Sequence, residues 1–199
     1  MADKYFGDMA TLTADEWNDN AVDQAVCTVT SGTRPTGIER RLIYETDTKR
    51  TLRYDGASWL VVWQPWTAFT PSWTNLSVSD GTQEAGYAIM AGVVYCRGAV
   101  TFGSSTSITG APTLTPPVTM DSTRCPTYTP TGLAYLRDDS GSVNRYGRTI
   151  AASSGTAVQM RYLNTSGTYT AATTVSSSAP FSWATGDVLY WSLTYPTTI

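Results

Sequence analysis

Two neighbouring carboxylates, Asp138 and Asp139, begin the stretch whose residue types have the most potential for chemistry. A glycosidase needs two carboxyl groups that face each other across a cleft. Adjacent residues point to opposite faces of a strand, and in a turn both side chains meet water. Because the following Ser-Gly-Ser favours a turn, we do not expect this pair to cleave glycosidic bonds.

The same stretch continues with Asn144, Arg145 and Tyr146, which add an amide, a cation and an aromatic ring. Loops at one end of a β domain often carry binding sites, and polar groups beside an aromatic side chain suit a glycan. An ordinary solvated surface loop is the alternative interpretation. The candidate receptor site for a glycan therefore consists of Asp138, Asp139, Asn144, Arg145 and Tyr146.

Other kinds of catalysis find little support in the residue types. The chain has no histidine, which removes the commonest general base and metal ligand and excludes a Ser-His-Asp triad. Cys27, Cys96 and Cys125 are an odd number at wide spacing, which fits neither a zinc site nor a disulfide framework, so we expect reduced thiols. No glycine-rich phosphate loop is present. We predict no enzymatic activity, no cofactor and no metal ion.

Composition and charge narrow the partners and the fold class. The formal net charge is −3 and the pI is near 4.8, with no basic patch, so nucleic acid is not an expected partner. No apolar run approaches the ~20 residues of a membrane span, and the first residues lack a secretory signal pattern, so we expect neither membrane insertion nor export by that route. Thr, Tyr, Trp and Val are abundant, and Gly and Pro are spread as turn signals. This composition predicts a mainly β protein.

Residues 1–31 are predicted to form an attachment and trimerisation segment that contains one short helix. Thr13 and Glu16 fit a capping box, and apolar residues follow at helical spacing, so we place the helix at about 14–26. A helix this short is marginal alone, and its apolar stripe must dock on something. The protein's own hairpin and the same helix in other copies are both possible partners. The stripe consists of Trp17, Ala21, Val22 and Ala25.

Residues 32–63 are predicted to form a small β-meander. Three strand-like runs are separated by two turn signals, the second of which is Asp55-Gly56. A unit of this size cannot bury a core of its own, so it must pack on another domain or on copies of itself.

Residues 64–75 are predicted to be an extended connector because two prolines bracket its aromatic residues. Trp66 and Trp73 are expected to pin this connector onto the following domain, since the large apolar area of Trp is usually buried. A platform on which sugars stack is the alternative role for these two side chains.

Residues 76–199 are predicted to form a jelly-roll-like antiparallel β-sandwich from several short strands. Near the C-terminus, apolar residues alternate strictly over 189–195, as on a strand with one buried face. An earlier strand alternates in the same way, with one face in the core and the other wet or interfacial. Its two faces are Val94, Cys96, Gly98, Val100 and Phe102, and Tyr95, Arg97, Ala99 and Thr101.

Two parts of the chain resemble appendage proteins of tailed bacteriophages. The first resemblance is dense from 33 to 59 and rests on the sequences Gly32–Pro35, Leu42–Thr48 and Tyr54–Trp59. The second covers about 66–195, where Phe181, Trp183 and the sequence Thr-Gly-Asp at 185–187 precede an aromatic last strand. This closing pattern is similar to the heads of actinobacterial-phage tail fibres.

The resemblance implies a homotrimeric virion protein, a tail fibre or tail-tip receptor-binding protein that is assembled in the host cytoplasm. Its N-terminal segment would attach to other virion proteins, and its head would adhere to a glycan of the host envelope. A head fibre, neck or capsid decoration without a dedicated receptor is the alternative. Depolymerases of such phages tend to be long β-helices, and this chain has no repeat of that kind. The expected attachment and trimerisation residues are Trp17, Ala21, Val22, Ala25, Leu42, Tyr44, Tyr54 and Trp59.

Overall fold

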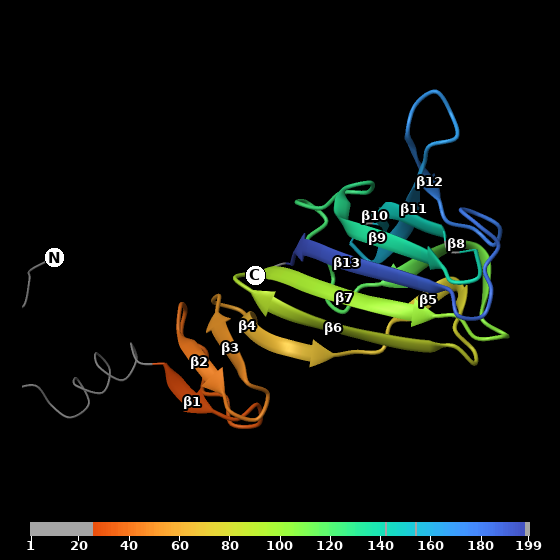
Figure 1. The fold of residues 1–199 in the computed structure, drawn as a ribbon. Coiled ribbons are helices and arrows are strands. Elements are labelled where there is room, and N and C mark those ends of the chain that lie inside the picture. The colour runs from red at the N-terminus through yellow and green to blue at the C-terminus, as the bar shows by residue number, and fades with distance from the viewer. Residues whose placement is uncertain (1–25, 142, 154, 198–199) are drawn as a thin grey trace, which may run out of the picture. The chain divides into compact units, whose positions relative to one another are not determined.

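The computed structural model describes residues 26–141, 143–153 and 155–197, and within these ranges every regular element is a β-strand (Figure 1). The mainly β character expected from the composition is therefore confirmed. The helix predicted at about 14–26, with Trp17, Ala21, Val22 and Ala25, falls on residues outside the described ranges. Only its last position, Val26, is described, and it lies in irregular chain before the first strand.

The chain folds into two compact units that divide between Gln64 and Pro65. The strands of the first unit are β1 (Cys27–Val29), β2 (Leu42–Glu45), β3 (Arg50–Tyr54) and the beginning of β4 (Trp59–Ala68). The second unit contains the end of β4 together with β5 (Ser72–Ser77), β6 (Thr82–Met90), β7 (Val93–Thr101), β8 (Ser107–Thr115), β9 (Pro130–Asp138), β10 (Val143–Ser153), β11 (Ala157–Asn164), β12 (Ala171–Thr174) and β13 (Val188–Pro196).

In the first unit, β2, β3 and β4 form an antiparallel meander, and β1 adds a short parallel strand beside β2. Ile43 and Leu52 are paired across β2 and β3 and are buried. Glu45 is fully buried as well, where it accepts hydrogen bonds from Arg34 and Thr48, both at 2.5 Å. Burial opposes ionisation of Glu45, but these two hydrogen bonds and the charge of Arg34 outweigh it and lower the pKa.

The meander places the expected trimerisation residues on two different faces. Leu42 is the partner of Arg53, so Leu42 and Tyr44 share one face, and Leu42 is 39% exposed there. Tyr54 and Trp59 lie on the opposite face, where their ring centroids are 5.3 Å apart. Because side chains alternate along a strand, these four residues cannot contribute to a single apolar surface.

The second unit is built from antiparallel pairs in the order β6-β7-β13-β9-β10-β11-β8-β5, with β12 beside β11. The end of β4 adjoins β6, where the Phe69 N–H donates to the Ala85 carbonyl. The sequence suggested a two-sheet jelly roll, but backbone hydrogen bonds connect these strands in one continuous sheet. Trp73 of β5 nevertheless contacts Trp191 of β13, so the two parts of the sheet pack face to face.

Alternation along β7 and β13 separates the core from an outer face, as the sequence predicted. Val94, Cys96, Val100 and Phe102 are buried, whereas Tyr95 is exposed. On β13 the buried set is Leu189, Trp191, Leu193 and Tyr195. Trp191 fits over β7 because Gly98 has no side chain: a Cβ there would lie within 2.8 Å of Ala85 Cβ and closer still to the indole.

A carboxylate clamp holds two loops of the second unit together. Asp80 accepts hydrogen bonds from the backbone N–H of Ser104 and Ser105 and from the Ser104 hydroxyl, at 2.7–2.9 Å. These bonds, with the Ser104 hydroxyl the strongest contributor, hold the pKa of Asp80 far below its ordinary value.

None of the segments that the structure describes forms a helix long and apolar enough to cross a bilayer.

Candidate functional site

The register of five strands aligns a row of side chains across the outer face of the second unit. Glu84 of β6 pairs with Ala99 of β7, and Ala99 pairs with Tyr190 of β13. Tyr190 pairs with Tyr135 of β9, which pairs with Tyr146 of β10. Partners in neighbouring strands project to the same side of a sheet, so these five side chains form one line on the outer face.

Three tyrosines form a continuous aromatic surface in this row. The ring centroids of Tyr190 and Tyr135 are 5.7 Å apart, and those of Tyr135 and Tyr146 are 5.2 Å apart. Tyr190 is 39% exposed and Tyr146 is 67% exposed. Aromatic rings at these distances support one another in place, and their hydroxyls remain available to a ligand.

A second row of side chains runs beside the first, and Trp66 of β4 packs against it. Gly86 pairs with Arg97, and Arg97 pairs with Ser192. The Trp66 indole lies against Gly86, and the Arg97 guanidinium sits over its ring, 4.8 Å from the centroid. Trp66 remains 49% exposed. We expected Trp66 and Trp73 to be buried where they pin the connector. Trp73 is half-buried and its Nε1 donates to Gln83 at 3.1 Å, whereas Trp66 packs on Gly86 with about half of its surface exposed.

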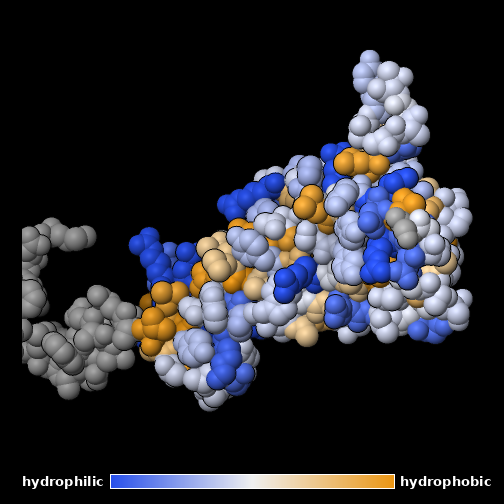
Figure 2. All heavy atoms as spheres, viewed as in Figure 1, coloured by the Kyte–Doolittle hydropathy of each residue, from blue (hydrophilic) through white to orange (hydrophobic). Residues whose placement is uncertain are grey.

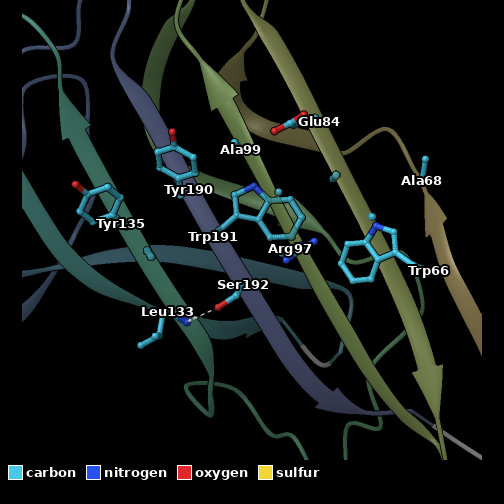
Figure 3. A pocket seen from close by; sticks show the side chains of 14 residues that line it. Trp66, Ala68, Glu84, Arg97, Ala99, Leu133, Tyr135, Tyr190, Trp191 and Ser192 are labelled. Carbon is cyan, nitrogen blue, oxygen red and sulfur yellow. Dashed lines mark hydrogen bonds between the residues drawn. The ribbon is translucent and has the colours of Figure 1, made fainter.

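A groove of about 640 Å³ lies between Trp66 and the tyrosines (Figure 3). Its floor is low because Ala99 and Ser192 are small residues between large ones. In Figure 3, Trp66 lies on one side, and Tyr190 and Tyr135 lie on the other. The Ser192 hydroxyl accepts the Leu133 N–H at 3.3 Å, which leaves its own proton free to donate.

The groove continues into a second, more polar hollow along the same strands. Glu84, Ala99 and Tyr190 line both spaces, and Thr82 and Thr101 extend the surface beyond them. Figure 2 shows the second unit with a mostly pale and blue surface on which orange patches are separated, not one continuous apolar field. The site is thus an elongated, open surface with aromatic walls and hydroxyl-bearing neighbours.

The residues that line the groove carry few charged groups. Among the residues that line the larger space, Glu84 is the one carboxylate and Arg97 the one cation. Hydrolysis of a glycosidic bond requires a second carboxyl group across the substrate. Nor does any group of three or more Cys, Asp or Glu residues within the described ranges lie close enough to hold a metal ion.

Asp138 and Asp139, the two carboxylates of the glycan site expected from the sequence, form hydrogen bonds and an ion pair within the protein. Asp138 accepts hydrogen bonds from the Ser140 hydroxyl at 2.9 Å and from the Gly141 N–H at 2.6 Å, as in a turn. Asp139 is paired with Arg137, and its N–H donates to Asp187 at 2.9 Å. Both side chains are therefore engaged within the protein. The expectation that both would meet water is correct for Asp139 but wrong for Asp138, which is buried.

The remaining three residues of that loop site do not share one face. Tyr146 lies on the outer face as the last member of the tyrosine row, and Asn144 precedes it by two residues on the same side. Arg145 alternates to the other side of β10, and its guanidinium donates to the Asn144 carbonyl at 3.3 Å. Of the five residues proposed from sequence, Tyr146 is the one connected to the groove by ring contacts.

Sequence reasoning did not identify Trp66, Arg97, Glu84 and Tyr190 as one site. One signal is present in the sequence, because alternation along 94–102 places Arg97 and Ala99 on the wet or interfacial face of their strand. Four further strands, β4, β6, β9 and β13, contribute to the groove, and only their register brings these residues together. A comparison of the chain with models of known families, with curated proteins and with solved structures finds no match.

Proposed function

We propose that this chain is a receptor-binding appendage protein of the tailed-bacteriophage type, whose second unit adheres to a glycan of the host envelope. The observation that carries the proposal is the groove between Trp66 and the Tyr190–Tyr135 pair. Its volume lies in the range of ligand sites, roughly 300–1,000 Å³. The resemblance of 33–59 and 66–195 to phage fibre proteins supplies the biological setting.

A glycan fits the groove for physical reasons. Sugar rings present apolar C–H faces that can stack on aromatic side chains, and hydroxyls that need hydrogen-bond partners. Trp66 and Tyr190 provide exposed rings, Tyr135 adds a half-buried ring beside Tyr190, and Ser192 and Glu84 provide a donor and an acceptor. The open, elongated shape suits a chain of sugars that enters and leaves along the surface.

We propose further that the protein works as a homotrimer displayed on the virion, with compact β heads carried on an N-terminal attachment segment. The first unit supports this because its fully buried side chains include Ile43 and Leu52 but also the polar Glu45 and Gln64. So small an apolar core gives little stability by itself, and contact with other copies or virion proteins would supply more. Enzymatic activity is not part of the proposal.

A binding experiment with the full-length protein tests this function. Purified protein is mixed with cell-wall and envelope preparations of candidate hosts, and bound protein is measured. Trp66→Ala and Tyr190→Ala should each weaken binding about tenfold or more, which corresponds to about 1.4 kcal/mol or more. Tyr169→Ala is the matched control, because Tyr169 is an exposed aromatic residue that does not line the groove.

Two outcomes would contradict the proposal. Wild-type protein that binds no preparation from any susceptible host would refute adhesion. Binding that is unchanged in Trp66→Ala and Tyr190→Ala but lost in Tyr169→Ala would place the site elsewhere. Electron microscopy of whole particles would separate a tail position from a head or neck decoration.

A further inference from the structure

We propose that the groove selects an acidic glycan, and that Arg97 binds the carboxylate or phosphate group of that glycan. This inference rests on the proposed function, because it names the chemical class of ligand for the same groove. Three observations support it. The Arg97 guanidinium is held by the ring of Trp66, its N–H donors have no protein acceptor within the described residues, and the carboxylate of Glu84 lies one row away.

Arg97 is held by an aromatic ring instead of a carboxylate. Its guanidinium lies 4.8 Å from the centroid of Trp66. Within the part of the chain that the structure describes, no carboxylate oxygen comes within 4.0 Å of its nitrogens, and its N–H groups donate to no protein acceptor. Two other arginines differ from Arg97 in this respect: Arg34 is paired with the buried Glu45, and Arg137 with Asp139.

This contact fixes the guanidinium without neutralising it. A cation over an indole ring gains roughly 0.5–1 kcal/mol at an exposed site, and all of its N–H donors stay available. Trp66 is itself positioned by the absence of a side chain at Gly86, the Cα partner of Arg97. The planar fork of arginine matches the two oxygens of a carboxylate or phosphate, and prior ordering lowers the entropy lost on binding.

The opposite end of the groove carries the opposite charge. Glu84 lies one row away from Arg97, which is two residues and about 7 Å along a strand. Figure 3 shows Glu84 directed away from Arg97, which points towards Trp66. A carboxylate repels anions and accepts hydrogen bonds from hydroxyls. The site therefore favours a ligand with an anionic group at the Arg97 end and a neutral, hydroxylated sugar near Glu84 and Tyr190.

Paired oligosaccharides test this charge selection with the full-length protein. The probes are an oligouronate, the same oligosaccharide with its carboxyl groups reduced to alcohols, and a glycerol-phosphate oligomer with its neutral glycerol counterpart. We expect at least one acidic probe to bind tenfold or more tightly than its neutral partner. Which acidic probe binds distinguishes a carboxylate from a phosphate as the recognised group.

Substitutions link the selection to Arg97. Arg97→Gln should abolish the preference for the acidic probe, and Arg97→Lys should retain only part of it because lysine lacks the planar fork. Arg40→Gln changes the net charge equally and is the control, since the Arg40 side chain is 90% exposed and lies in the first unit. Rising salt should weaken binding of the acidic probe more than that of the neutral one.

The inference and the proposed function fail in different ways. Equal binding of acidic and neutral probes, binding of neutral probes alone, or an unchanged preference in Arg97→Gln overturns the inference while cell-wall adhesion stands. Loss of adhesion to every host preparation refutes the proposed function. Self-association that Trp66→Ala abolishes, without any saccharide binding, would make the face an interface between copies and overturn both. Circular dichroism identical to wild type shows that each variant is folded.

Discussion

Replacing Gly86 by alanine should displace the Trp66 indole while every side chain of the groove remains present. The new Cβ would lie 2.5 Å from Cε2 and 2.8 Å from Cζ2 of the ring. Carbon atoms need about 3.5 Å, so the ring must move by about 1 Å. The backbone at Gly86 is not in the left-handed region, so alanine adds no backbone strain of its own.

The burial of Trp66 sets the size of the expected effect on stability. A fully buried tryptophan hides roughly 250 Å². Trp66 is 49% exposed, so its contact with the sheet covers about half of that area and contributes about 3 kcal/mol at 25 cal/mol per Å². A shift of the ring forfeits part of this contact and the stacking on Arg97. We expect the free energy of unfolding to fall by about 1 kcal/mol and glycan affinity to fall about tenfold.

Denaturant unfolding, tryptophan emission and saccharide binding measure the three consequences. Gly167→Ala is the matched control, because the nearest atom to its new Cβ is 3.8 Å away, an ordinary contact. The control should unfold, fluoresce and bind like the wild type. The reasoning is refuted if Gly86→Ala folds with the emission spectrum and the affinity of the wild type, since the indole would then not depend on the space above Gly86.

Three further predictions concern the core of the second unit, its Asp80 clamp and the thiols of both units. Leu136→Ala should lower the free energy of unfolding by about 2–5 kcal/mol because that side chain is fully buried, whereas Leu133→Ala, at a 70% exposed position of the same strand, should change it by less than about 0.5 kcal/mol; denaturant titration decides. Asp80 has a pKa below its ordinary value of 3.8, so its stabilising effect is present above that pH and is lost as the pH falls; Asp80→Asn should be less stable than wild type at pH 7, and the difference should shrink in unfolding curves at pH 3. Burial raises the pKa of Cys96 to about 12, so a thiol reagent at pH 8 should leave Cys96 unmodified in the folded protein and react first with the half-buried Cys27, as mass spectrometry of peptides would show.

Local patterns were enough to predict which side chains of a strand enter the core. Alternation over Val94–Phe102 and over Leu189–Tyr195 identified the buried faces of β7 and β13, because successive residues of a strand point to opposite sides. Turn chemistry correctly predicted that Asp138 serves a turn, since aspartate readily accepts hydrogen bonds from backbone two or three residues ahead. Both features depend on residues that are close in the sequence.

The groove depends on residues that are far apart in the sequence. Trp66, Arg97 and Tyr190 belong to three strands. The alternation of side chains along a strand does not specify its partner strand, and it is unchanged by any even shift of register. What selects one arrangement is packing on the inner side of the sheet, where Trp191 rests over Gly98 and meets Trp73.

The sequence by itself determined the β character, the buried faces of β7 and β13 and the turn at Asp138. Only the tertiary structure decided that Glu84, Ala99, Tyr190, Tyr135 and Tyr146 lie in one row, and that Trp66 and Arg97 stand beside them. The physical reason is that backbone hydrogen bonds form equally well in many registers. Side-chain packing in the core fixes the register, and this register determines which side chains are neighbours on the outer face.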